Sequence, residues 1–189
     1  MKTITCYRFV TDNLKSDEDK NISWIIGKWN KIDVKPKCCE SGFHASMTSL
    51  QSLNNVYGNR WFIAEARGKF DKEYDKFCST EMRLVKEIPI EVIKRFALFC
   101  AKDCLKYYEK EYPNDNRVSE CIRITELYLD GKATLKELTA ARAAAWAAWA
   151  AEDAARAAGA AWAAWAARAA EKRQEKEIKR LIKEYTKDE

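Results

Sequence analysis

The only histidine of the chain, His44, stands in a short segment rich in groups that could do chemistry. This segment, residues 38–46, reads Cys-Cys-Glu-Ser-Gly-Phe-His-Ala-Ser. Gly42 permits a tight turn, and the imidazole would then lie where a helix is expected to begin, a place where backbone N–H groups favour anions. No catalytic triad order is recognisable around it. Two interpretations stay open: His44 binds an anion, or it stabilises the turn by a hydrogen bond.

Arg60 is the second candidate contact for an anionic ligand. It opens an apolar run that should form a strand and return beside the turn of residues 38–46. A guanidinium matches phosphate or carboxylate oxygens with two parallel hydrogen bonds. We therefore expect His44 and Arg60 to contact any small anion that this part of the chain binds.

A further candidate site lies on an alanine-rich tract, residues 140–170, which carries four of the seven tryptophans. On a straight helix, five of its side chains fall within about 80° of one another: Arg142, Trp146, Trp149, Asp153 and Arg156. Guanidinium groups hold phosphates and indole rings stack on bases, so the arginines and tryptophans of this stripe could bind a nucleotide-type anion. The alternative is a packed helix seam in which Asp153 neutralises an arginine.

Trp162 and Trp165 lie on nearly the opposite side of the same tract if its helix continues through Gly159. Two indoles on an alanine helix would leave an apolar patch that monomers rarely expose. We therefore expect the protein to form a homo-oligomer through Trp162 and Trp165.

The seven cysteines favour free thiols over a metal site. Cys38, Cys39 and His44 could in principle join Cys6 or Cys78 around zinc. There is no C-x-x-C pair, however, and adjacent cysteines seldom ligate one ion together. The cysteine count is odd, and the first ten residues contain no apolar signal segment. We expect no metal, no cofactor and a reducing cytosolic location.

The first 90 residues predict an α+β domain. Runs of β-branched and aromatic residues predict strands at 3–10, 23–29, 60–68 and 82–90. Between them, Ser46 or Thr48 can cap a helix over 46–58 that Gly58 would end.

From Pro89 onward the pattern becomes helical, and we expect an all-α domain over 91–189. Its expected helices are 91–112, one that follows Asn114 or Asp115 and ends at Asp130-Gly131, an Ala/Trp-rich helix at about 134–170, and a charged helix over 171–189. The expected apolar stripe of the first helix consists of Ile93, Ala97, Cys100, Cys104, Tyr107 and Tyr108. Thr134 and Glu137 form a capping box at the start of the Ala/Trp-rich helix. In the charged helix, the residues able to dock are Ile178, Leu181, Ile182 and Tyr185.

Charge excludes two classes of function. The net charge of +5 comes from 34 basic and 29 acidic residues that are mostly interspersed, which is too mild to indicate binding of a nucleic acid polymer. The alanine tract is long enough to cross a membrane, but five charged residues interrupt it and alanine is barely apolar, so we expect no membrane span.

The segment Cys38 to Gly68 is similar to a small uncharacterised domain of bacteriophage proteins. The residues that carry this similarity are Gly42-Phe-His-Ala-Ser46, the short helix ending in Tyr57-Gly58, and the run Arg60 to Gly68. The same pattern faintly resembles the central segment of ADP-ribosyltransferases, in which a Gly-aromatic turn, a helix and a strand frame the nicotinamide nucleotide. That resemblance implies a transferase fold with His44 in the place of a ring-stacking aromatic.

A second similarity begins at Tyr112-Pro-Asn-Asp-Asn-Arg117 and continues through Leu129-Asp-Gly131 and Leu138 to Gly159. This pattern resembles a helical family described as immunity proteins of bacterial toxin systems. It implies binding of a protein partner rather than catalysis.

Together these features predict a non-enzymatic, cytosolic binding protein of a phage or mobile element. It would capture an anionic nucleotide-type signal, or a toxin or defence protein, in bacterial immunity. One alternative is an ADP-ribosyltransferase-like enzyme with a helical accessory domain, and a second is a structural oligomer assembled through the Ala/Trp-rich helix.

Overall fold

The computed structural model describes residues 2–16, 22–152 and 163–187, with backbone alone for 146–152 and 163–169. Contacts divide the chain into two compact units, one of Met1–Val92 with Ile178–Glu189 and the other of Ile93–Glu177. The first is built on an antiparallel sheet and the second on helices, which confirms the α+β fold class.

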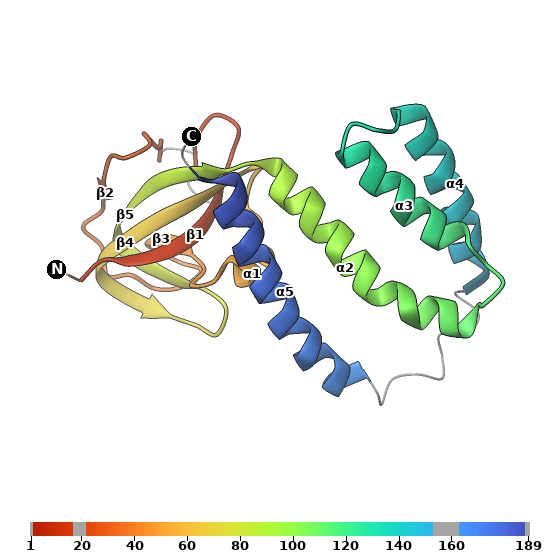
Figure 1. Ribbon diagram of the computed structural model, residues 1–189. Coiled ribbons are helices and arrows are strands. Elements are labelled where there is room, and N and C mark those ends of the chain that lie inside the picture. Colours follow the sequence, from red (N-terminus) through yellow and green to blue (C-terminus); the bar gives the residue numbers. More distant parts are fainter. Residues whose placement is uncertain (1, 17–21, 153–162, 188–189) are drawn as a thin grey trace. The chain divides into compact units, whose positions relative to one another are not determined.

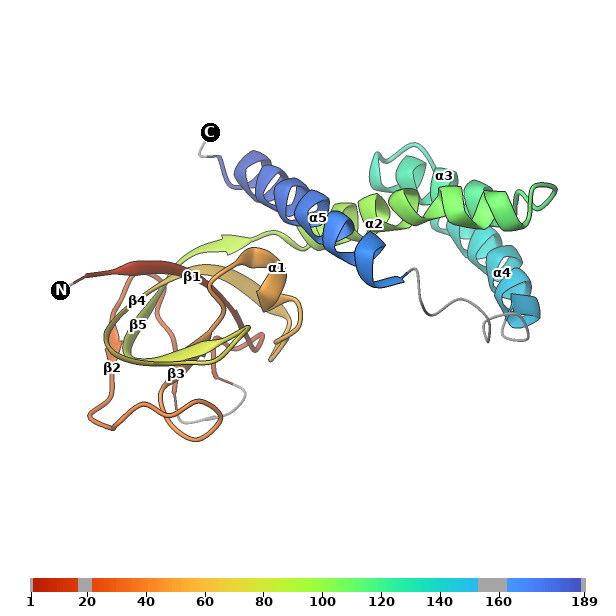
Figure 2. The same cartoon turned by 90° about the horizontal axis from the view of Figure 1, so that it is seen from below.

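The sheet of the first unit has five strands (Figure 1): β1 (Ile4–Val10), β2 (Asn30–Lys31), β3 (Phe43–Ala45), β4 (Arg60–Lys72) and β5 (Phe77–Ile88). Their order is β1-β4-β5-β2, β3 also pairs with β5, and every pairing is antiparallel. A bridge between Tyr7 and Ser46 ties the end of β3 back to β1. Figure 2 shows how strongly the strands curve.

Strand alternation explains the core of this unit. Alternate residues of a strand point to the same face, and one face of β1, β4 and β5 is fully covered through Cys6, Val10, Phe62, Ala64, Ala66, Met82 and Leu84. On the other face, Trp61 stacks on Phe9 with ring centroids 5.6 Å apart, and its indole N–H donates to Ser52 Oγ at 3.0 Å. Apolar side chains of these strands are therefore buried on both faces of the sheet.

The predicted strand at 23–29 is wrong. Only Ser23 makes a β-bridge, to Lys15, and the chain then turns through Gly27, whose φ is +82°. Ile25 and Ile26 are exposed, while Trp24 is buried. The run is apolar, but a glycine in the left-handed conformation breaks it, so no strand forms there.

The predicted helix at 46–58 is shorter in the structure. Helix α1 spans Ser49–Ser52, and Thr48 caps it in a capping box with Gln51. The helix therefore starts at one of the two predicted caps, but it ends long before Gly58. That glycine has a different role, because its backbone passes directly against Val10.

The helices are α2 (Ile90–Glu111), α3 (Arg117–Leu129), α4 (Leu135–Glu152) and α5 (Ala163–Tyr185). Pro89 separates β5 from α2 as expected, and Pro113 lies just beyond the end of α2. In Figures 1 and 2, α3 and α4 lie side by side. Of the single helix predicted over 134–170, α4 and the start of α5 are described, whereas Gly159 lies outside the described residues. None of the helices in the described ranges is long and apolar enough to cross a membrane.

The capping box of α4 is confirmed. Glu137 Oε2 accepts a hydrogen bond from the Thr134 backbone N at 2.7 Å, and Thr134 Oγ1 accepts one from the Glu137 N at 3.3 Å. The apolar stripe predicted for α2 is only partly covered: Ile93, Cys100 and Tyr108 are half-buried, whereas Ala97, Cys104 and Tyr107 are exposed. The buried side chains of α2 are those of Val92, Phe96 and Leu98.

The end of α5 belongs to the first unit. Ile178, Leu181 and Ile182 are buried, as expected of the apolar residues in this otherwise charged helix, and Tyr185 is half-buried. The Lys86 ammonium on β5 donates to the Thr186 carbonyl at 2.5 Å. The last turns of α5 are therefore part of the hydrophobic packing around the sheet.

Candidate functional site

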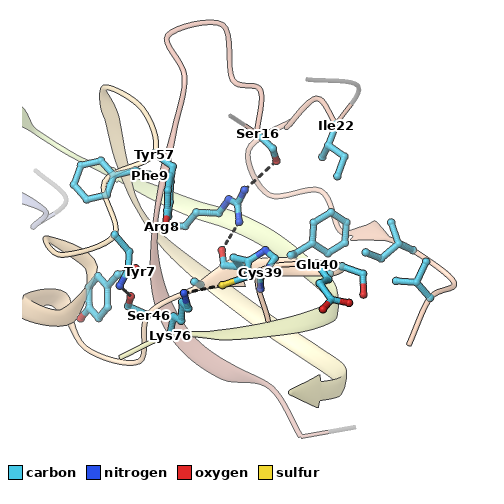
Figure 3. Close-up of a pocket in the computed structure, with 18 residues that line it drawn as sticks. Tyr7, Arg8, Phe9, Ser16, Ile22, Cys39, Glu40, Ser46, Tyr57 and Lys76 are labelled. Atoms are coloured by element: carbon cyan, nitrogen blue, oxygen red, sulfur yellow. Dashed lines mark hydrogen bonds between the residues drawn. The ribbon is translucent and has the colours of Figure 1, made fainter. Parts of the chain in front are cut away.

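A pocket of about 510 Å³ lies in the first unit. Its walls come from β1, β3, the turn at residues 37–41, and the turn between β4 and β5. Figure 3 shows the side chains that line it, among them Arg8, Cys39 and Lys76. The strand pairings bring these segments together from distant parts of the sequence.

Arg8 fixes a positive charge in the pocket wall. It occupies a buried position of β1 and is only 5% exposed. Its guanidinium donates to the His44 carbonyl and, at 3.0 Å, to Ser16 Oγ, and it lies 5.1 Å from the centre of the Trp24 ring. The Trp24 indole N–H donates to the same Ser16 oxygen at 3.0 Å. This network holds the guanidinium in one orientation.

Lys76 supplies the second cation of the pocket. Its ammonium lies 2.9 Å from Cys39 Sγ and 3.4 Å from the Glu73 carboxylate. The hydrogen bond with Cys39 is the main reason that the pKa of Lys76 is raised above its ordinary value, so Lys76 stays charged. Cys39 has a φ of +65°, a left-handed conformation that is uncommon for a residue with a side chain.

His44 lines the pocket and also braces its turn. The Cys39 backbone N–H donates to His44 Nε2 at 2.9 Å. In this geometry the Nε2 atom is the acceptor, and the hydrogen bond ties the turn to β3. His44 thus acts here as a hydrogen-bond acceptor for the turn, and the cationic groups of the pocket are Arg8 and Lys76.

Arg60 does not line the pocket. It is the first residue of β4, and its guanidinium forms a two-point ion pair with Glu87 on β5, at 2.8 and 2.5 Å. Hydrogen bonding to Arg60 holds the pKa of Glu87 below its ordinary value. This ion pair therefore joins two neighbouring strands.

The helical candidates are only partly described. Arg142 lies on α4 and is exposed. Trp146 and Trp149 lie on α4 and Trp165 on α5, but their side chains are outside the described residues, as are Arg156 and Trp162 altogether. Ligand stacking on this stripe and self-association through Trp162 and Trp165 stay predictions.

Sequence reasoning missed the pocket cations, although one of them leaves a signal. Ile4, Cys6, Arg8 and Val10 alternate along β1, so Arg8 is a charged residue on an otherwise apolar strand face. A charge in such a position needs buried hydrogen-bonding partners, and this requirement makes Arg8 a candidate site residue. Lys76 leaves no comparable signal, because its position depends on the register of the β4–β5 hairpin.

A second cluster of reactive groups forms at the hairpin end. Cys38 Sγ, Cys78 Sγ and an Asp71 carboxylate oxygen all lie within 4.8 Å of one another. Burial raises the pKa of Cys38, and it raises that of Cys78 to about 12. None of the seven cysteines, all within the described residues, is in a disulfide. The sequence alone grouped Cys38 and Cys78 only with Cys39, His44 or Cys6 and gave no place to Asp71.

In the second unit, the turn at residues 112–117 is organised by Asp115. Its carboxylate accepts hydrogen bonds from the Tyr108 hydroxyl at 3.0 Å and from the Arg117 backbone N at 3.0 Å. It also pairs with the Arg117 guanidinium at 2.5 Å, and the hydrogen bonds with Arg117 lower the pKa of Asp115. These contacts connect the end of α2 to the start of α3.

Comparison with known families divides the chain in two. Residues 4–95 match a family model described as "Domain of unknown function (DUF7666)", and residues 83–174 match one described as "Imm-5 like putative immunity protein". The two matches overlap across the end of β5 and the start of α2, and each covers slightly less than half of the chain. No curated protein and no solved structure matches it. The chain therefore joins a segment similar to a domain of unknown function to a segment similar to an Imm-5 like immunity protein.

Proposed function

We propose that this protein has an immunity-type role as a binding protein, and that its first unit captures an anionic small molecule of nucleotide type. One observation carries the ligand part of the proposal: two basic residues, Arg8 and Lys76, line the same pocket. An anion placed there would accept charge-assisted hydrogen bonds, which are stronger than neutral ones.

The size and lining of the pocket support a nucleotide-type ligand. Small-molecule sites commonly have volumes of about 300–1,000 Å³ and combine apolar walls with a few polar groups. The rings of Tyr7 and Tyr57 contribute aromatic surface, on which a base could stack. Among the described residues that line the pocket, Glu40 alone carries a carboxylate, and it pairs with Lys37 at 2.5 Å. The residues that line the pocket would therefore repel an anion little.

The partner of the helical part would be a protein such as a toxin. This part of the proposal depends on the match of residues 83–174 to the Imm-5 like family model. A cytosolic setting in the conflict between bacteria and phages or mobile elements is consistent with that similarity. The small-molecule pocket and the helical segment would then serve different ligands.

Isothermal titration of the purified protein with ADP-ribose, AMP and inorganic phosphate tests the ligand part. If the proposal is right, at least one nucleotide binds more tightly than phosphate, and Lys76→Met weakens that binding roughly tenfold to a hundredfold through loss of one charge-assisted contact. The matched control is Lys72→Met, because Lys72 is an exposed lysine of the same hairpin outside the pocket.

Arg8→Met gives a second measurement. Since Arg8 is buried, its variant is titrated beside a melting curve, so that a loss of binding is counted only for protein that is still folded. Equal affinity in the wild type, Lys76→Met and Arg8→Met would refute the pocket as the ligand site.

The transferase alternative would be favoured by a glutamate on a later strand at the pocket. In the described strands β4 and β5, the glutamates are engaged by arginines: Glu65 by Arg83, Glu81 by Arg67 and Glu87 by Arg60. None of these three lines the pocket. The binding function is therefore the one we propose.

A further inference from the structure

The cluster of Cys38, Asp71 and Cys78 has the composition of a metal site, and it is separate from the pocket. None of the three residues lines the pocket. Cys38 belongs to the turn at 37–41, Asp71 to the end of β4 and Cys78 to the start of β5. The two cysteine side chains are buried, at 6% and 0% exposure, and Asp71 is half-buried.

The fold holds these three groups together through backbone constraints. Asp71 and Cys78 are paired across β4 and β5, and directly paired residues project to the same face of a sheet. The Cys38 backbone N–H donates to Asp71 Oδ2 at 2.9 Å, and its Sγ lies 3.5 Å from the Asp71 carbonyl oxygen. The turn is thereby fixed to the strand that carries the carboxylate.

Gly42 completes the arrangement. It has a φ of +111°, and a Cβ added there would lie 3.0 Å from Cys78 Cβ and 3.3 Å from Cys78 Sγ. Only a residue without a side chain lets the backbone pass so close to the sulfur. The two sulfur atoms and the carboxylate therefore face one another in a small volume enclosed by three chain segments.

We propose that Cys38, Cys78 and Asp71 bind a zinc ion. Two sulfur donors select soft or borderline metals over magnesium and calcium, and a carboxylate is an accepted third ligand for zinc. Ligand distances of about 2.3 Å to sulfur and 2.0–2.2 Å to oxygen need only a modest contraction of the cluster. Water would fill the fourth position. Each thiol gives up its proton to solvent as its sulfur binds the ion, so binding releases two protons.

The spacing of the cysteines in the sequence alone predicts no metal site, and the proposed zinc site differs from that expectation. The sequence contains no C-x-x-C pair, and the cluster exists because a turn, a strand pairing and a glycine bring remote residues together. The competing chemistry is oxidation of the Cys38 and Cys78 thiols to a disulfide, which would use up both sulfur donors. The experiment must separate the two.

Cobalt(II) is the probe, because it occupies zinc sites and its bonds to thiolates absorb light. Fully reduced protein is titrated with cobalt and then with zinc. We expect one equivalent of cobalt to produce a sulfur-to-cobalt charge-transfer band that zinc abolishes. Cys78→Ser and Cys38→Ser should abolish the band, and Asp71→Asn should weaken cobalt binding by roughly tenfold or more.

Cys104→Ser is the matched control, since Cys104 is an exposed cysteine of α2. It should keep the band unchanged. Melting curves accompany every variant, and Asp71→Asn, which removes no buried sulfur, keeps the test valid if a cysteine variant fails to fold. Absence of the band in wild-type protein with seven titratable thiols would overturn the proposal, as would a band that survives in folded Cys38→Ser. Loss of two thiols to a Cys38–Cys78 disulfide, without cobalt binding by the reduced form, would also overturn it.

Discussion

Cys6 illustrates how burial alone changes the chemistry of a single group. It lies on β1 with no exposed surface, in the core formed with Val10 and Phe62. Burial raises the pKa of its thiol to about 12, against an ordinary value of 9.0. The thiolate form is therefore disfavoured in the folded protein but not in the unfolded chain.

This difference predicts a loss of stability at alkaline pH. The unfolded chain releases the Cys6 proton near pH 9, whereas the folded protein retains it, so the free energy of unfolding falls as the pH rises from 9 toward 12. Urea unfolding at a series of pH values measures the slope. Cys6→Ala should make the alkaline slope shallower, and an unchanged slope in this variant would show that Cys6 does not contribute to it.

Gly58 has a conformational role that no other residue can take. Its φ is +135°, and an added Cβ would lie 2.3 Å from both the carbonyl carbon and the oxygen of Val10. Gly58→Ala should therefore lower the free energy of unfolding by at least about 2 kcal/mol, because backbone strain and overpacking add together.

Gly27→Ala is the control for Gly58→Ala. Gly27 also has a positive φ, +82°, but nothing lies within 4 Å of an added Cβ. Its replacement should cost only the left-handed conformation, about 1 kcal/mol. Chemical denaturation of both variants decides the matter, and equal losses would contradict the close contact with Val10.

At the scale of elements, the sequence predicts structure best where caps and breakers act locally. Thr134 with Glu137 marks the start of α4, and Pro89 the end of β5. Prediction from the sequence fails where tertiary contacts determine the structure. Residues 23–29 are apolar but turn through Gly27, and the buried face of α2 contains Phe96, which the predicted stripe does not include. The candidate site shows the same division, since His44 was found from its motif, while Lys76 required the hairpin register.

The capping box of α4 gives a prediction for this element. Thr134→Ala should lower the free energy of unfolding by about 0.5–2 kcal/mol, because the Glu137 N–H loses its side-chain acceptor. Thr139→Ala is the control within the same helix. The Thr139 hydroxyl bonds back to the Leu135 carbonyl at 2.8 Å, and alanine is the better helix former, so this change should be neutral or slightly stabilising. Denaturation followed by helical circular dichroism compares them, and a larger loss in Thr139→Ala would contradict the cap.

Helix α5 gives a second prediction at this scale. Ile178 has no exposed surface, so Ile178→Ala should lower the free energy of unfolding by about 2–5 kcal/mol through lost burial and a residual cavity. Lys183, on the exposed side of the same helix, is the matched control and should tolerate alanine within about 0.5 kcal/mol. If both variants melt alike, the end of α5 does not pack as described.

For the whole molecule, acid should be destabilising in both units. Carboxylates whose pKa is lowered in the folded protein, chiefly by hydrogen bonds, occur throughout: Asp71 and Glu87 in the first unit, and Asp103, Asp115, Glu120, Asp130 and Glu137 in the second. Each stabilises the fold fully above its ordinary pKa of 3.8 or 4.5, and this contribution disappears as the pH falls through the lowered value.

We therefore expect the free energy of unfolding to be nearly constant from neutral pH to about pH 5 and to decrease steeply below it. Denaturant unfolding from pH 7 to pH 2 measures the profile. Asp115→Asn should flatten part of the acid slope, since Asp115 accepts hydrogen bonds from both Tyr108 and Arg117. A profile that is flat down to pH 2 would show that these hydrogen bonds do not stabilise the fold.

The two chain segments that form the first unit are synthesised at different times. This unit is discontinuous in sequence, because it combines Met1–Val92 with Ile178–Glu189. A ribosome synthesises chains from the N-terminus at about 5–20 residues per second, so the sheet emerges several seconds before the turns of α5 that contribute Ile178 and Leu181. During that interval the nascent sheet lacks part of its apolar cover while the whole second unit is translated. The first unit to be started is therefore the last to be completed, and the nascent chain would need protection from aggregation until α5 arrives.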